Sequence, residues 1–134
     1  MASGCLIPRL EHHEYRDRGD ACLIHANADA VSAELQPGDD LEIVVFFPHG
    51  CLSSSCSDVR ITTCEATLTG NEIHVSSHGV VEEDVSANAC TTDCGIMTAR
   101  CNIDLDEPGD YTIVHGDQTT PITLPGEPEC AGGL

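Results

Sequence analysis

Cysteine is the residue type whose number and spacing offer the most chemistry in this chain. The sequence holds nine cysteines in 134 residues. Thiolates that bind zinc usually occur as C-x-x-C pairs, and the sequence contains no such pair. The closest spacings run from Cys51 to Cys56 and from Cys90 to Cys94, and no histidine follows either at zinc-finger distance. The spacing therefore favours a disulfide framework, which forms in an oxidising compartment outside the cytoplasm.

An odd number of cysteines leaves one outside any set of internal bridges. Cys5 is the candidate, because it precedes a polar stretch rather than lying in a strand pattern. The residues before it, Ala2, Ser3 and Gly4, resemble the end of a bacterial lipoprotein signal, in which small residues precede a cysteine that receives the lipid. The apolar stretch that such a signal requires is missing from the sequence. The alternative is that Cys5 is a spare thiol or pairs between chains. The other eight cysteines are expected to form four disulfides.

Histidine is the second residue type with possible chemistry, and the chain has seven. His49 and His115 lie at the ends of predicted strands, where loops can converge, and are the candidates for a zinc or copper site. His74 and His78 share a strand face but lie roughly 13 Å apart along it, too far for one ion. A blue-copper site is not indicated, because no histidine follows Cys94 at short range. Solvated surface histidines are the alternative.

Two acidic clusters raise the question of calcium. Asp104, Asp106, Glu107 and Asp110 surround a Pro-Gly turn, and residues 82–84 are all acidic. Oxygen-rich loops suit Ca²⁺, but the spacing of an EF-hand is absent. In so acidic a chain, composition alone also produces such clusters. We therefore expect no cofactor, with zinc, copper and calcium as the alternatives.

Patterns for catalysis are absent from the sequence. Ser53–Ser55 lies between two cysteines in an expected disulfide loop and not in a G-x-S-x-G elbow. No glycine-rich loop leads from a strand into a helix to bind phosphate. The one cysteine expected to be unpaired, Cys5, lies at a chain end that is a poor place for a nucleophile. The sequence therefore predicts a protein that is not an enzyme.

The charge of the chain restricts its partners. There are five arginines, no lysine and 23 acidic residues, which give a net charge of −18. Such a surface repels nucleic acid, and no basic patch is present to bind anionic lipid. No apolar run approaches the ~20 residues of a transmembrane helix. We therefore expect the partner to be a protein or a surface. The acidic charge is expected either to suit saline surroundings or to serve solubility alone.

Short apolar runs separated by turn residues predict the elements that position these side chains. No stretch shows the 3.6-residue period of a helix, so the fold class is all-β with minimal helix, a disulfide-stapled sandwich of about seven antiparallel strands. Residues 1–20 are expected to be a tether or irregular lead-in, 21–134 a single sandwich domain, and 80–95 a long loop. The predicted strands are 28–35, 41–47, 59–68, 72–77, 96–105, 111–115 and 120–124.

Alternation along these strands predicts the core and part of the disulfide pattern. The inward sets are Leu41, Ile43, Val45 and Phe47; Thr62, Cys64, Ala66 and Leu68; Ile73 and Val75; and Met97, Ala99, Cys101, Ile103 and Leu105. Cys64 and Cys101 thus both point inward, and a bridge between them contributes about 3–4 kcal/mol. Cys22 with Cys130 is expected to fasten the two ends of the domain. The remaining four cysteines pair either locally or across loops: Cys51, Cys56, Cys90 and Cys94. Both possibilities stay open, because eight cysteines allow about 105 connectivities.

The segment from Leu105 to Val114 resembles the tyrosine corner of immunoglobulin-like and fibronectin-like sandwiches. It has an apolar residue, a Pro-Gly turn and then Tyr111 opening the next strand. The resemblance implies a buried ring whose hydroxyl bonds to the backbone upstream. The sequence departs from antibody domains, because it has no tryptophan and no cysteine two residues after Tyr111. The fold implied is an immunoglobulin-like sandwich.

These features together predict a non-enzymatic binding or structural module outside the cytoplasm. It would be secreted, periplasmic or held at the outer surface by a lipid on Cys5. One alternative is a periplasmic protein that binds zinc or copper through histidines. Another is a subunit of a surface filament.

Overall fold

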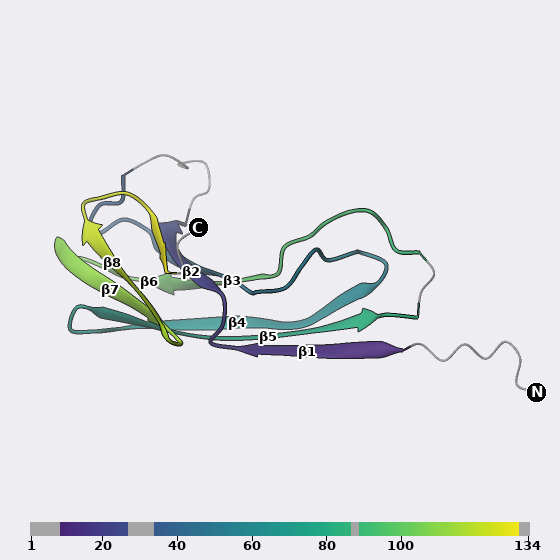
Figure 1. Ribbon diagram of the computed structural model, residues 1–134. Coiled ribbons are helices and arrows are strands. Elements are labelled where there is room, and N and C mark those ends of the chain that lie inside the picture. The colour runs from purple at the N-terminus through teal and green to yellow at the C-terminus, as the bar shows by residue number, and fades with distance from the viewer. Residues whose placement is uncertain (1–8, 27–33, 87–88, 132–134) are drawn as a thin grey trace, which may run out of the picture.

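The computed structural model describes residues 9–26, 34–86 and 89–131, and this part of the chain is all-β. Its strands form two sheets that pack as a sandwich (Figure 1). No helix is present among these residues, and so none that is long and apolar enough to cross a membrane. The prediction of an all-β sandwich with minimal helix is confirmed.

The described residues form nine strands where about seven were predicted. The five-stranded sheet consists of β1 (Leu10–Arg16), β4 (Ser57–Thr69), β5 (Glu72–Asp84), β7 (Gly109–His115) and β8 (Gln118–Leu124). The four-stranded sheet has the order β6 (Thr98–Ile103), β3 (Leu41–Phe46), β2 (Asp20–His25) and β9 (Glu129–Ala131).

The long strand β5 organises the larger sheet, because it pairs with three others. One of its edges pairs with β4 over nearly its whole length. The other edge pairs with β1 through residues 78–84 and with β7 through residues 72–75. The β5–β7 pair is parallel, so the expectation of a wholly antiparallel sandwich is wrong. The end of the sheet that contains β1 extends beyond the smaller sheet as an arm (Figure 1).

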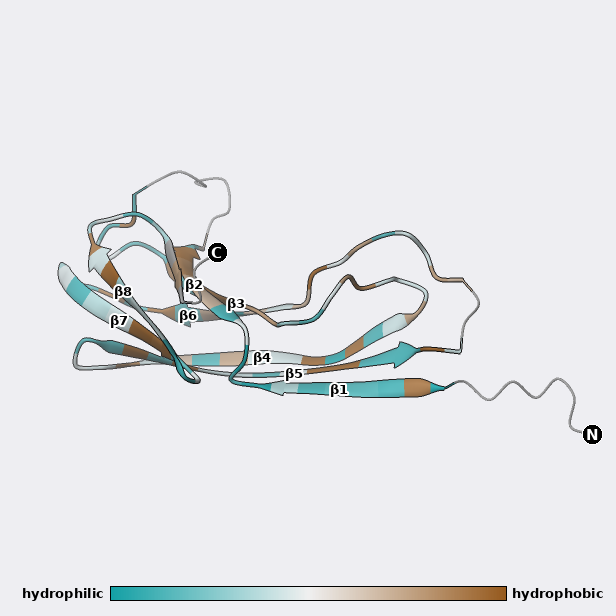
Figure 2. Ribbon diagram, viewed as in Figure 1, coloured by the Kyte–Doolittle hydropathy of each residue, from teal (hydrophilic) through white to brown (hydrophobic). Residues whose placement is uncertain are grey.

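The core lies between the facing sides of the two sheets, as the alternation predicted. The predicted inward sets of β3, β5 and β6 are buried, Cys101 partly so. Figure 2 shows the same alternation along the strands, with hydrophobic residues interrupted by hydrophilic ones, whereas β1 is almost entirely hydrophilic. The core has no tryptophan, and its largest buried side chains are mostly aliphatic.

The predicted inward set of β4 is only partly correct. The hairpin of β4 and β5 forms as predicted, with Gly70 at φ +61° in its turn. Cys64 and Ala66 pack against the core, but Thr62 and Leu68 are exposed. The reason is that β4 is an edge strand, which pairs with β5 alone.

Four disulfides join the described residues, and two of them are the favoured pairs. Cys22–Cys130 connects directly opposed residues of β2 and β9, and Cys64–Cys101 connects the two sheets. The other four cysteines bridge two loops, as Cys51–Cys94 and Cys56–Cys90, and not locally. Such a set of bridges indicates an oxidising environment.

Three predicted boundaries differ from the structure. Residues 1–20 are not irregular throughout, because β1 occupies Leu10–Arg16 and pairs with β5, and β2 begins at Asp20. Residues 80–95 are not all loop, because β5 continues to Asp84. Most of the predicted strand 28–35 lies outside the described residues, and its last residue, Leu35, forms an isolated bridge with Gly126.

Candidate binding surface

Two disulfides hold a pair of loops against each other above the arm of the larger sheet (Figure 1). We call them the loop pair: residues 48–56, between β3 and β4, and the described residues of 85–97, between β5 and β6. Next to the bridge Cys51–Cys94, Leu52 and Gly95 exchange backbone hydrogen bonds of 3.0 and 2.9 Å. The loops are therefore fixed to each other by covalent bonds and by a short ladder.

The outer part of the loop pair presents hydroxyl groups and one carboxylate. The hydroxyl of Thr91 lies 2.7 Å from that of Ser53 and 3.1 Å from that of Ser54. The backbone N–H of Ser54 donates to both carboxylate oxygens of Asp93, each at 3.3 Å. Hydrogen bonds from Thr91 and Ser54 lower the pKa of the Asp93 carboxyl below its usual value. The result is an exposed polar surface whose side chains are held in place by one another.

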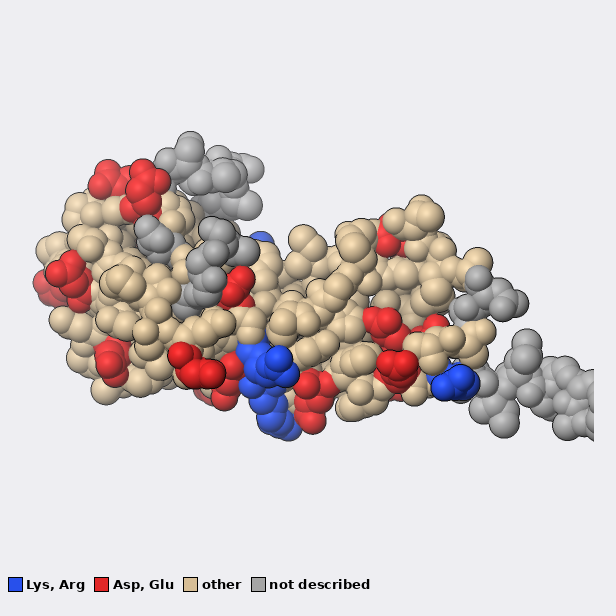
Figure 3. All heavy atoms as spheres, in the orientation of Figure 1, with Lys and Arg blue, Asp and Glu red and all other residues tan. Residues whose placement is uncertain are grey.

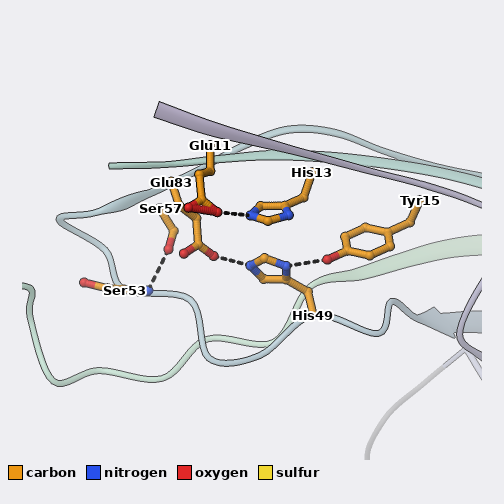
Figure 4. A network of polar contacts seen from close by, with 7 residues as sticks. All are labelled: Glu11, His13, Tyr15, His49, Ser53, Ser57 and Glu83. Carbon is orange, nitrogen blue, oxygen red and sulfur yellow. Dashed lines mark hydrogen bonds and ion pairs between the residues drawn. The ribbon is translucent and has the colours of Figure 1, made fainter. Parts of the chain in front are cut away.

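Beneath the loop pair, His49 fastens the first loop to the arm (Figure 4). Its side chain is only 8% exposed. Nδ1 lies 2.8 Å from the hydroxyl of Tyr15 on β1, and Nε2 contacts the carboxylate of Glu83 on β5. Both ring nitrogens thus have a partner, and each partner comes from a different strand. His49 therefore acts as a structural link.

A second histidine extends this network along β1. The ring of His13 packs against that of His49, with centroids 5.3 Å apart, and its Nε2 lies 3.5 Å from Glu11. Glu11 and Glu83 are directly opposite each other in the β1–β5 register. In Figure 4 their carboxylates lie together on the side of the two imidazoles. Each carboxylate has an imidazole nitrogen as its partner, Glu11 that of His13 and Glu83 that of His49.

His115, the other predicted metal ligand, lies elsewhere and has its own partners. It is 1% exposed, with Nε2 at 2.8 Å from the hydroxyl of Ser77 and Nδ1 at 2.9 Å from the carbonyl oxygen of Gly19. The structure does not bring His49 and His115 together. Across residues 9–26, 34–86 and 89–131, no three His, Cys, Asp or Glu side chains are arranged to hold a metal ion. Both histidines that were predicted to bind metal have a polar partner at each ring nitrogen within the fold.

Members of both acidic clusters considered for calcium have protein partners in the described structure. Glu82 pairs with Arg60 at 3.0 Å, and Glu83 contacts His49. At the Pro-Gly turn, Asp110 accepts a hydrogen bond of 2.9 Å from Thr123. Acidic side chains are spread over the whole face seen in Figure 3, whereas arginines gather in a few places. This distribution fits a chain that is acidic throughout.

Tyr111 makes the contact that the tyrosine-corner resemblance implied. Its ring is buried, and its hydroxyl donates to the carbonyl oxygen of Glu107 at 2.6 Å. The other predicted site residue, Cys5, lies outside the described residues. The link from Tyr15 through His49 to Glu83 was not predicted, because its members are 34 positions apart on each side. No periodicity or short motif connects residues at that distance.

Comparison with known proteins adds no relative: no protein-family model, no curated protein and no solved structure matches the chain.

Proposed function

We propose that this protein is a non-enzymatic binding module that works outside the cytoplasm and that the loop pair is its binding surface. One observation carries the proposal. Two of the four disulfides in the described residues do not join strands but join two exposed loops to each other. Loops that bind a partner must be ordered when they do so, and loops that are ordered beforehand lose less entropy on binding.

The polar surface of the loop pair supports the same proposal. Thr91 and Asp93 are exposed, and both are already held by hydrogen bonds to the opposite loop. Hydroxyl and carboxylate groups in fixed positions suit recognition of a polar partner through directional hydrogen bonds. Because the module is so acidic, its partner is neutral or basic on the contacting surface.

The location of the protein outside the cytoplasm is part of the proposal. Four disulfides indicate an oxidising environment. We infer that the protein is secreted or held at a cell surface, with a lipid on Cys5 as the attachment in the second case. We infer also that the sandwich is of the immunoglobulin-like kind, a proposal supported by the buried corner at Tyr111.

A pair of matched variants tests the binding surface. Ser54→Arg places a bulky cation on the loop pair, and Thr119→Arg makes the same change in charge at an exposed position on β8. Saturable binding of the disulfide-intact protein to the surface fraction of its source cells is measured for each. We expect Ser54→Arg to weaken binding and Thr119→Arg to leave it unchanged. Equal binding by both variants, or no saturable binding by the unchanged protein, would overturn the proposal.

Chemical cross-linking identifies the partner in the same experiment. The chain has no lysine, so amine-reactive reagents have little to attack, whereas its 23 acidic residues suit a carbodiimide reagent, which joins a carboxylate of this chain to an amine of the partner. Cross-links from Asp93 to a partner are expected. Cross-links confined to the opposite end of the sandwich would contradict the assignment of the loop pair.

A further inference from the structure

The outer edge of β4 differs from the other edges of the two sheets. Native proteins protect edge strands with charges, proline, bulges or short length. β1 is rich in charged residues and histidine, β8 contains Pro121, and β6 and β9 have six and three residues. β4 has thirteen residues, no proline and no lysine, and its one bulge lies near its start, between Val59 and Ile61. The stretch from Ile61 to Thr69 has one charged residue, Glu65, and is otherwise an unprotected edge.

The composition of β4 also favours pairing. Three of the six large hydrophobic residues that are exposed in the described part of the chain belong to it: Val59, Ile61 and Leu68, at 40%, 37% and 39%. Threonine accounts for much of the remainder, and β-branched side chains stabilise extended strands. This strand therefore has the residues of a paired strand but a partner on one side only.

The hydrogen bonds of β5 show which groups of β4 face the free edge. Ser77 exchanges backbone and side-chain hydrogen bonds with Asp17, on the side of β5 away from β4. Its neighbours Ser76 and His78 therefore direct their N–H and C=O groups to Glu65 and Thr63 of β4, their register partners. Since these groups alternate along a strand, Thr62, Cys64 and Ala66 present theirs to the free edge.

We propose that β4 pairs with the same strand of a second copy of this chain, antiparallel about a two-fold axis at Thr63. In this register Thr62 of each copy faces Cys64 of the other, so the free donors and acceptors meet. Glu65 lies opposite Ile61 of the other copy. The bulge and the ion pair with Glu82 place Arg60 on this same face, so Glu65 and the Arg60 of the other copy bring opposite charges together at both ends of the contact. A register centred two residues further on would instead place Glu65 opposite Glu65.

This contact is separate from the loop pair and does not depend on its role. A two-fold contact uses the same strand in both copies and is complete with two, so it gives a dimer and not a filament. Each copy carries a charge of −18, which opposes association at a distance. Salt shortens the range of this repulsion to about 10 Å at 0.1 M and about 3 Å at 1 M. The dimer is therefore favoured by salt.

Sedimentation equilibrium at about 0.1 M and about 1 M salt tests the contact. Thr62→Pro removes an N–H that faces the free edge and leaves the ladder to β5 intact, whereas Thr62→Val keeps this N–H and the branched side chain. We expect the unchanged protein and Thr62→Val to dimerise more strongly at high salt, and Thr62→Pro to bind about tenfold more weakly or not at all. A monomer at every concentration in both salts, or equal dimers from Thr62→Pro, would overturn the proposal.

A charge exchange tests the register with variants that leave the backbone unchanged. Glu65→Arg and Arg60→Glu each place like charges together in their own dimer. In a mixed dimer the arginine introduced at position 65 lies beside the glutamate introduced at position 60, and the unchanged Arg60 and Glu65 lie beside each other. The mixture should therefore associate more strongly than either variant alone. A mixture no stronger than its components would overturn the register.

Glu65→Arg also controls for net charge. Glu65→Arg makes the chain less acidic, and this change by itself would promote association, so a weaker dimer from this variant reports the local contact and not the overall repulsion.

Discussion

Asp17 and Ser77 exchange hydrogen bonds at the point where β5 changes partner. The backbone N–H of Asp17 donates to the carbonyl oxygen of Ser77 at 3.0 Å, and the N–H of Ser77 donates to Oδ1 of Asp17 at 2.8 Å. On this edge of β5, β1 ends just before the contact and β7 pairs just beyond it. Asp17 has a φ of 53°, in the left-handed region where aspartate and asparagine are enriched. One residue thus closes the gap between two strands.

Replacing Asp17 tests this role. Asp17→Ala removes the acceptor and places a less suitable residue in the left-handed region, so we expect a loss of about 1–3 kcal/mol in the free energy of unfolding. Asp17→Asn keeps an oxygen acceptor and the tolerance for this backbone conformation, so its loss should be smaller. Urea denaturation measures both. Equal stabilities for the two variants would show that the contact contributes nothing.

The hydrogen bond from Tyr15 to His49 predicts a local effect on the loop pair. Tyr15→Phe removes the hydroxyl and leaves His49 with one partner, at a cost of about 1 kcal/mol. We expect faster hydrogen exchange at the amides of Leu52 and Gly95, whose ladder lies in the loop above. Unchanged exchange at these two amides would contradict the proposed link between the arm and the loops.

The hydrogen bond at Tyr111 predicts an effect on the stability of the whole domain. Tyr111→Phe leaves the carbonyl oxygen of Glu107 without its donor and should lower the free energy of unfolding by about 1 kcal/mol. Glu107→Ala is the matched control, because it keeps the backbone carbonyl and removes only an exposed side chain. Denaturant unfolding should therefore separate the two variants, and Tyr111→Phe should leave exchange at Leu52 unchanged.

The parts of the fold that could be predicted are those that local patterns determine. Alternation in 41–47 identified the inward set of a strand, because a two-residue period has only one such set, although Val44 on the opposite face is buried as well. The same argument placed Cys64 and Cys101 in the core, and their bridge is present. The corner at Tyr111 was visible because all its residues lie within ten positions.

The parts that could not be predicted depend on contacts between distant segments. β1 has the sequence LEHHEYR, whose only half-buried residues are His13 and Tyr15, and it forms a strand because β5 offers it an edge. The pairing of Cys51 with Cys94 depends on two loops that meet above the arm. His49 is positioned in the same way, by strands that lie 34 residues before and after it. No local sequence pattern predicts contacts between segments so far apart in the chain.

Removing a disulfide of the loop pair should lower the free energy of unfolding, and the bridge Cys64–Cys101 offers a matched comparison. Cys56 and Cys90 are 34 positions apart, and Cys64 and Cys101 are 37 apart, so loop closure contributes nearly the same free energy to each bridge, about 4 kcal/mol. Replacing either pair with alanine should lower the free energy of unfolding by about 2–4 kcal/mol. Removal of Cys64–Cys101 should cost more, since both residues pack against the core. The opposite order in denaturant unfolding would contradict this assignment.

Glu14 predicts how β1 responds to pH. A hydrogen bond of 2.6 Å to His78, with smaller contributions from Arg16, lowers the pKa of the Glu14 carboxyl below its ordinary value of about 4.3. A lowered pKa means that folding favours the carboxylate, so its contribution is present above the ordinary pKa and is lost as the pH falls through the folded pKa. The protection factors of the β1 amides, which are corrected for the intrinsic slowing of exchange in acid, should therefore fall at low pH, and less so in Glu14→Gln, which has no proton to gain.

The cause of that lowered pKa can be tested separately. His78→Ala removes the principal hydrogen bond, so an NMR titration should show the pKa of Glu14 rising toward its ordinary value. His74→Ala is the control, because His74 is an exposed histidine of the same strand that pairs with Glu72 and not with Glu14. If the pKa of Glu14 were unchanged in His78→Ala, or rose equally in both variants, the link between β1 and β5 through His78 would be wrong. A rise confined to His78→Ala would place the pH response in that one cross-strand contact.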